Sequence, residues 1–217
     1  MRSLLASVLD WVYPPRCELC LRIGRPAICD ECLDAFVPLP NRVTTHVSGS
    51  SLDVTAALYS FEGRAAQAVK RLKYGRATAL GPFMSEMIKE SLDQLPLPAF
   101  DVIVPVPIHR SRRHARGFNQ SDLLCESLSS PSDYKGMLTR TRSTKPQVGL
   151  SKSQRLMNLK GAFYASGSAD DRRILLVDDV TTTGGTGIAC AEALKAAGAA
   201  YVGLLAFCGE SEPSRVG

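Results

Sequence analysis

Residues 174–186 read ILLVDDVTTTGGT, and this stretch decides the fold of the chain. Its first half is a short, continuously apolar run that ends in two carboxylates, which is typical of a strand buried on both faces of a parallel sheet. The small residues after it predict a loop, and residues 187–198, GIACAEALKAAG, predict a helix that Gly198 ends. The stretch therefore predicts a strand, a loop and a helix in direct succession.

Polar residues stand at the end of this predicted strand. Ligands bind at the C-terminal ends of strands in open α/β sheets, so Asp178 and Asp179 lie where a ligand is expected. The loop from Thr181 to Thr186 suits an anion, because glycines let backbone N–H groups turn inward and the next helix offers the positive end of its dipole. A phosphate held there would place an attached sugar over the acids, which can accept hydrogen bonds from its hydroxyls or hold water on Mg²⁺.

A plainer interpretation is that Asp178 and Asp179 merely end a strand and that TTTGG is a tight turn. Two adjacent acids and six small, donor-rich residues ahead of a helix favour ligand binding instead. Two other phosphate-binding motifs do not match. The loop lacks the Gly-Lys-Ser/Thr ending of a triphosphate-binding loop, and Cys190 stands where a dinucleotide fingerprint has its third glycine.

The rest of the chain alternates between strand-like and helix-like patterns, which is typical of a doubly wound parallel α/β sheet. Besides the strand at 172–180, strands are predicted at 54–61, 101–107, 136–142 and 199–207. Helices are predicted at 63–74, 81–92 and 117–129, and residues 151–163 are predicted as a helix or a loop. We expect the strand at 101–107 to lie beside the one that carries the acid pair.

Four of the seven cysteines, Cys17, Cys20, Cys29 and Cys32, form two Cys-x-x-Cys pairs separated by eight residues. Such pairs can converge as four thiolates around one tetrahedral, structural Zn²⁺. An iron–sulfur cluster or a redox-active dithiol pair is the alternative. The other three, Cys125, Cys190 and Cys208, sit singly in apolar stretches and are predicted to be small buried hydrophobic residues.

Composition suggests where the chain divides. Residues 1–36 would hold an N-terminal helix and the zinc module, 37–51 a linker rich in Pro, Ser and Thr, 52–209 the α/β domain and 210–217 a flexible tail. No apolar run approaches the roughly 20 residues of a membrane span, and no cleavage site follows the first residues. We therefore expect a cytoplasmic protein without membrane insertion.

Positive charge is concentrated in the middle of the chain. Residues 101–160 contain 11 Lys and Arg against 4 Asp and Glu, whereas the rest has 15 against 17. Four arginines follow the strand at 101–107, and their planar guanidinium groups suit phosphate recognition. Either a polyanion pocket or a nucleic-acid surface would give this pattern, and a solvated basic loop is the plainer alternative.

VDDVTTTGGT resembles the binding signature for phosphoribosyl pyrophosphate (PRPP) in type I phosphoribosyltransferases. The whole chain resembles the ComF family, which is linked to DNA uptake in competent bacteria. The resemblance is carried by the N-terminal Cys-x-x-Cys pairs, KYGRATALG, VPVPIHRSRRHARGFNQ, KPQVGLSKSQR and VDDVTTTGGT. It implies a type I phosphoribosyltransferase fold with a small zinc module at its N-terminus.

The resemblance also implies roles for individual residues. The threonine-glycine loop would hold the 5′-phosphate, the acid pair the ribose hydroxyls, and the loop at Pro107–Arg110 the pyrophosphate. Arg116 is a further catalytic candidate beside Asp178 and Asp179, and Asn119 is a further candidate for ligand binding. Residues 145–155 are the candidate for a closing loop, with an exposed linker as the alternative. The predicted ligand-binding residues are Asp178, Asp179, Thr181, Thr182, Thr183, Gly184, Gly185, Thr186, Pro107, Ile108, His109 and Arg110.

Three functions agree with these patterns. The first is an enzyme that transfers phosphoribose from Mg²⁺-PRPP to an unidentified acceptor. The second is a non-catalytic module that binds PRPP or a related sugar phosphate and works through partners, such as a DNA-uptake translocase. The third is a single-stranded DNA binder, against which stands an aromatic content of 6%. The resemblance also suggests a homodimer.

Overall fold

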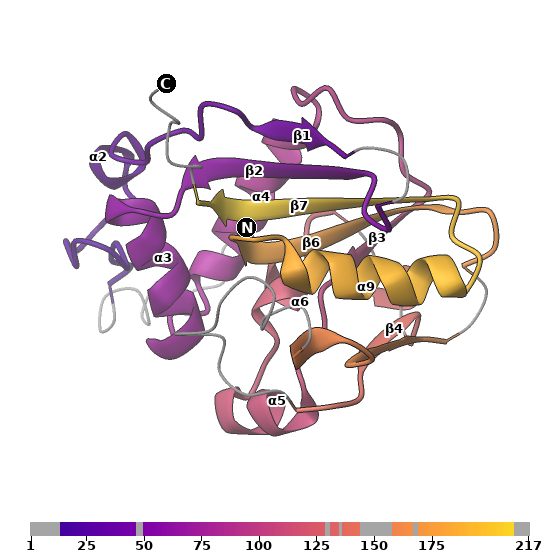
Figure 1. The fold of residues 1–217 in the computed structure, drawn as a ribbon. Coiled ribbons are helices and arrows are strands. Elements are labelled where there is room, and N and C mark those ends of the chain that lie inside the picture. The colour runs from indigo at the N-terminus through magenta and orange to yellow at the C-terminus, as the bar shows by residue number, and fades with distance from the viewer. Residues whose placement is uncertain are drawn as a thin grey trace.

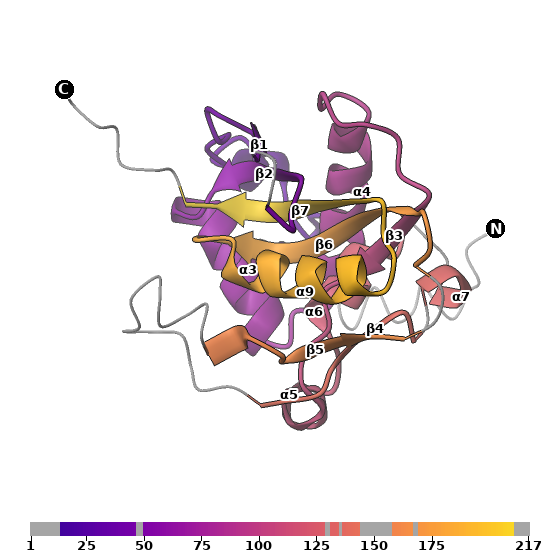
Figure 2. The same ribbon diagram turned by 45° about the vertical axis from the view of Figure 1, so that its right-hand side comes forward.

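The computed structural model describes residues 14–46, 50–128, 131–134, 136–143, 158–166 and 169–210. Its helices are α2 (Asp30–Leu33), α3 (Gly63–Tyr74), α4 (Leu80–Leu92), α5 (Arg110–Arg116), α6 (Gln120–Leu124), α7 (Pro131–Tyr134) and α9 (Gly185–Ala196). Its strands are β1 (Val43–Thr45), β2 (Val54–Ser60), β3 (Val102–Pro105), β4 (Leu138–Arg140), β5 (Phe163–Ala165), β6 (Arg173–Thr181) and β7 (Tyr201–Gly209). Figure 1 shows the ribbon, and Figure 2 shows it turned by 45°.

The central sheet has the strand order β1-β2-β7-β6-β3. Strands β2, β7, β6 and β3 are parallel to their neighbours, and β1 pairs with β2 in the antiparallel direction. The predicted doubly wound α/β fold is confirmed, and β3 lies beside β6 as expected. The antiparallel edge strand β1 was not predicted: it lies inside the segment 37–51 that composition suggested as a linker.

Helices cover both faces of this sheet (Figures 1 and 2). Side chains of a strand alternate between its faces, and Leu175 and Val177 accordingly pack in the core with α3 and α4, whereas Ile174 and Leu176 pack in the core with α9. Strand β6 is thus apolar on both faces up to its last residues. Its polar end is the place where the chain leaves the core.

The cysteine-rich segment packs against the same core as α3. The ring of Phe36 meets the rings of Tyr59 and Phe207, with centroids 5.2 and 6.1 Å apart, and Ile28 is buried in the same cluster. The small module therefore shares its hydrophobic support with the sheet. The domain boundaries suggested at 36, 51 and 209 stay predictions.

Several predicted elements differ from the observed ones. Arg110–Arg116, expected as a loop, is the helix α5, which Gly117 ends with a positive φ of 89°. The helix predicted at 117–129 is the shorter α6, and Phe163–Ala165 forms β5, which pairs with β4. Residues 144–157, 1–13 and 211–217 lie outside the described residues, and so do the predicted closing loop, N-terminal helix and tail. In the described part of the chain, every helix is too short or too polar to cross a bilayer.

Candidate functional site

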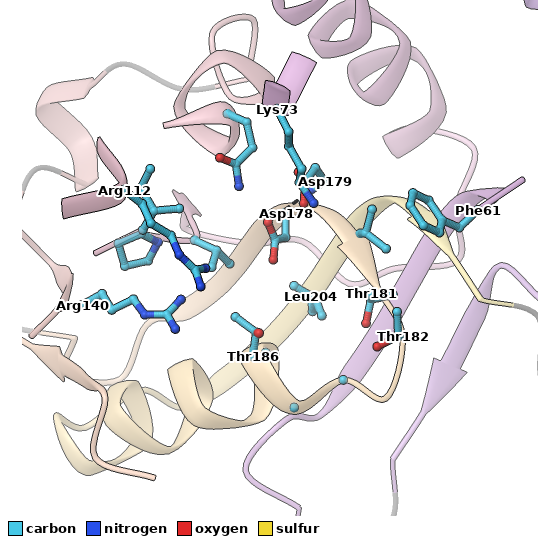
Figure 3. Close-up of a pocket in the computed structure, with 18 of the residues that line it drawn as sticks. Phe61, Lys73, Arg112, Arg140, Asp178, Asp179, Thr181, Thr182, Thr186 and Leu204 are labelled. Carbon is cyan, nitrogen blue, oxygen red and sulfur yellow. Dashed lines mark hydrogen bonds and ion pairs between the residues drawn. The ribbon is translucent and has the colours of Figure 1, made fainter. Parts of the chain in front are cut away.

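A pocket of about 880 Å³ opens at the C-terminal ends of β6 and β3, as the close-up in Figure 3 shows. Pockets of this size hold small-molecule ligands. Its wall contains the acid pair, the threonine-glycine loop and the segment after β3, together with basic side chains from α3, α5 and β4. Segments from α3, from β3 to α5, from β4 and from β6 to α9, which are far apart in the sequence, thus face one cavity.

The acid pair forms the floor of this pocket, where the two carboxylates are buried, with exposures of 9% for Asp178 and 2% for Asp179. Asp178 Oδ1 accepts hydrogen bonds from Ser121 Oγ at 3.1 Å and from the backbone N–H of Asp179 at 2.9 Å. Burial and the adjacent charge of Asp179 raise the pKa of Asp178 from 3.8 to about 7. The two hydrogen bonds orient the carboxyl group and favour its ionised form, but burial and the neighbouring charge outweigh them.

Asp179 has a different partner. The ammonium of Lys73, at the end of α3, lies 2.8 Å from Asp179 Oδ2, and its side chain is 21% exposed. Burial opposes the charge of Lys73, but the neighbouring carboxylates outweigh burial and raise the pKa of Lys73. A cation thus offsets part of the repulsion between two adjacent acids.

The threonine-glycine loop owes its shape to two glycines. Gly184 has φ 72°, a left-handed conformation that favours glycine, and α9 begins at the next residue. A Cβ on Gly187, in the first turn of α9, would lie 2.7 Å from a terminal side-chain carbon of Leu204, which would then have to move. Residues 181–186, which comprise the end of β6, the loop and the start of α9, therefore line the pocket at the positive end of the α9 dipole.

Arginines form the opposite wall. Arg112 from α5 and Arg140 from β4 converge on the side of the pocket that faces Asp178 and Thr186 (Figure 3). Burial and the charge of Arg112 lower the pKa of Arg140. Arg116 hydrogen-bonds to Gln120 and lies 5.6 Å from the centroid of the Tyr74 ring. An anion placed between these two guanidinium groups would offset their repulsion and could accept hydrogen bonds from both.

Most of the predicted ligand-binding residues line this one pocket. Those present are Asp178, Asp179, Thr181, Thr182, Thr183, Gly184, Gly185, Thr186, Pro107, Ile108 and Arg116. Among the residues that the structure describes, His109 and Arg110 are not part of this wall. His109 is the N-cap of α5, where its ring accepts a hydrogen bond from the backbone N–H of Ser111 at 3.3 Å.

Sequence reasoning missed Lys73, and it noted Arg112 and Arg140 only as members of a basic stretch. Lys73 belongs to KYGRATALG, one of the segments that carry the family resemblance, which was the available signal. Nothing in a helical pattern at 63–74 shows that its last turn reaches the acid pair.

The four cysteines of the predicted zinc module come together. Their Sγ atoms lie within 4.8 Å of one another, and those of Cys20 and Cys29 are 3.7 Å apart. Four sulfurs at the usual Zn–S distance in a tetrahedron are about 3.8 Å apart, so the residues fit this ion. Burial alone would raise the pKa of Cys17, but backbone N–H groups of Cys20, Cys29 and Leu19 lower it to about 6, which favours a thiolate.

Comparisons with known proteins agree with this arrangement. Residues 115–215 match the family model for the phosphoribosyl transferase domain. DNA utilization protein YhgH of Escherichia coli O157:H7 is 34% identical over 88% of this chain and 83% of its own length. Competence protein F of Haemophilus influenzae is 43% identical over 43% of this chain and 42% of its own length. Competence protein ComFC of Bacillus subtilis is 30% identical over 78% of this chain and 67% of its own length.

Proposed function

The chain belongs to the ComF family of phosphoribosyltransferase-like proteins, and from this premise we propose that it binds PRPP with Mg²⁺ in the pocket at the end of β6. One observation carries the proposal. A loop suited to a phosphate, a pair of acids suited to sugar hydroxyls and two converging arginines suited to a pyrophosphate line the same cavity. PRPP presents these three groups on one small molecule.

The order of the groups across the pocket agrees with the shape of this ligand. The 5′-phosphate accepts hydrogen bonds from the loop at Thr181–Thr186, and the ribose hydroxyls donate to Asp178 and Asp179. The pyrophosphate then lies towards Arg112 and Arg140, on the β3 side. Carboxylate oxygens are donors that Mg²⁺ prefers, directly or through water, so the floor of the pocket fits this ion as well.

We propose further that the pocket supports displacement of the pyrophosphate. The bond from C1 of the ribose to pyrophosphate breaks, its electron pair leaves with the pyrophosphate, and a new bond forms from C1 to a nucleophilic acceptor, whose proton goes to an oxygen of the departing pyrophosphate. Bound Mg²⁺ would offset the charge of the leaving group. The protein would act by holding the ligand, by placing arginines at the leaving group and by excluding water.

A second candidate is binding without turnover. The relatives are named for DNA utilisation and for competence, so a chain of this family can also act as a PRPP-responsive partner in DNA uptake. Saturable binding in the absence of pyrophosphate release, across a broad panel of acceptors, would favour this candidate over the enzyme.

Calorimetric titration of the full chain with Mg²⁺-PRPP tests the proposal before any acceptor is known. We expect one saturable site, and Asp178→Asn or Asp179→Asn should weaken binding by at least about tenfold, the scale of one lost charged hydrogen bond. Asp93→Asn is the matched control, because Asp93 is exposed at the end of α4. Equal affinity in all three variants would refute the proposed role of the acid pair.

A further inference from the structure

Helix α3 lies beside the cysteine module (Figure 1), and its last turn contributes Lys73 and Tyr74 to the wall of the pocket. On the module side, the backbone carbonyl of Leu19 accepts hydrogen bonds from Arg64 Nη1 and Gln67 Nε2, each at 3.3 Å. Arg71 Nη2 lies 3.0 Å from Glu18 Oε2, and both side chains are mostly buried. These three helix positions are three and four residues apart, so they share one face of α3.

The two residues that α3 contacts are the ones between the first pair of cysteines. Glu18 and Leu19 stand between Cys17 and Cys20, and the backbone N–H of Leu19 donates to Cys17 Sγ at 3.4 Å. A metal ion held by Cys17 and Cys20 would fix the backbone of this short segment. It would thereby fix the Leu19 carbonyl and the Glu18 carboxylate, which contact side chains of α3.

The last turn of α3 reaches the pocket. Arg71, which pairs with Glu18, is two residues before Lys73, which pairs with Asp179 at 2.8 Å. The helix ends at Tyr74, and the last turn of a helix frays readily unless side chains hold it. One turn of α3 therefore carries both the contact to the module and the contact to the acid pair.

We propose that Lys73 is a positioning residue that holds Asp179 towards the ligand, and that the cysteine module sets the position of Lys73 through the last turn of α3. Only the expected effect of this coupling on ligand affinity rests on the proposed function. The contact path from Glu18 through Arg71 and Lys73 to Asp179 is independent of what the pocket binds. It gives the module a role in the pocket as well as in folding.

A double-mutant cycle with Mg²⁺-PRPP as the probe tests this path. We expect Lys73→Met to weaken binding by about tenfold and Arg71→Met by about threefold, in keeping with the loss of partly buried ion pairs. In the Lys73→Met background, Arg71→Met should have no further effect. Lys73→Arg and Arg71→Lys should restore most of the affinity, which a purely structural role at these positions would not predict.

Each variant is first checked for one bound metal ion per chain and for its melting temperature. The matched control is Lys70→Met, because Lys70 is an exposed lysine of the same helix that does not line this pocket. An Arg71→Met effect of equal size in both backgrounds would overturn the coupling.

A second arm needs no ligand. Reductive methylation followed by mass spectrometry measures how readily each lysine amine reacts, and the buried, ion-paired Lys73 should react several-fold more slowly than Lys70 in the unaltered chain. Arg71→Met should reduce this protection. If PRPP does not bind but the protection is lost in Arg71→Met, the proposed function fails and the coupling stands. Unchanged protection of Lys73 in Arg71→Met would overturn the coupling whatever the pocket binds.

Discussion

The cysteine module and the pocket, which α3 joins through its last turn, are built in opposite ways. At the cysteine module, four sulfurs lie within 4.8 Å of one another, and three of the four cysteines are buried. At the pocket, two adjacent acids share the cation Lys73 and line an open cavity of about 880 Å³. The first cluster is closed and the second is open.

From this difference we expect the cysteine cluster to serve stability and the acid pair to serve ligand binding. A closed set of four sulfurs has no position left for a substrate, which is the mark of a structural metal site. In the acid pair, burial and the neighbouring charge raise the pKa of Asp178 beside an open cavity. Carboxylates with raised pKa values in a cleft are typical of functional sites. The comparison predicts that the fold depends most on the sulfurs and that ligand affinity depends on the acids and arginines.

Loss of a cysteine ligand should have the largest effect. Cys29→Ser should release the metal and lower the melting temperature by more than about 10 °C, because structural zinc sites contribute folding free energy directly. Metal content by mass spectrometry and thermal unfolding measure the two effects. Cys125→Ala is the control, since Cys125 is buried outside the cluster and its loss should leave the metal content unchanged. A Cys29→Ser chain that lacks metal but keeps its melting temperature would show that the fold does not depend on the cysteine cluster.

Stability should also depend on pH through the acid pair. The pKa of Asp178 is raised from 3.8 to about 7, so its contribution to stability is complete below about pH 4 and is lost as the pH rises towards 7. The side chain of Asp178→Asn does not ionise, so this variant does not lose stability as the pH rises through 7. Its amide oxygen can still accept the hydrogen bond from Ser121. The variant should therefore be more stable than the unaltered chain at pH 8, by at most about 4 kcal/mol.

Urea denaturation of both proteins at pH 8 and pH 5.5 measures this effect. The stability gap should narrow at the lower pH, and effects of pH on the cysteine module cancel because both proteins carry it. A gap of constant size, or a variant that is less stable at pH 8, would show that Asp178 is not strained by its burial.

The smallest expected effect concerns the two arginines of the pocket wall, Arg112 and Arg140. Arg112→Met or Arg140→Met should weaken PRPP binding by about tenfold, the loss of a charge-assisted contact to pyrophosphate. Binding of ribose 5-phosphate, which lacks pyrophosphate, should change little. Arg113→Met is the matched control, because Arg113 is 62% exposed and pairs with Asp122 at 3.3 Å. Equal losses of affinity for PRPP and for ribose 5-phosphate would show that the arginines do not bind the pyrophosphate.

Local patterns predicted much of the fold. The continuous apolar run before Asp178 is typical of a buried strand, and the glycines after it favour a turn, so β6, the loop and α9 were expected at nearly their observed bounds. The same holds for α3 and β7. The short strand β1 was not expected, because Val43–Thr45 is only three residues long, lies in a segment rich in Pro and Ser, and pairs with β2, a partner that local sequence does not reveal.

The candidate site was predictable only where its residues follow one another. The acids and the threonine-glycine loop are contiguous, so their chemistry was visible in the sequence. Lys73 and Arg140 reach the pocket from other elements, and tertiary packing alone brings them there. For α5, the arginines suggested an exposed loop, although Gly117 is a common way to end a helix.

A crystal structure of the full chain with Mg²⁺ and PRPP would show whether the end of β6 holds a sugar phosphate over two aspartates. We expect the 5′-phosphate in the loop at Thr181–Thr186 and the ribose hydroxyls within hydrogen-bonding distance of Asp178 and Asp179. An empty pocket at saturating ligand, or a ligand bound away from both aspartates, would contradict this expectation.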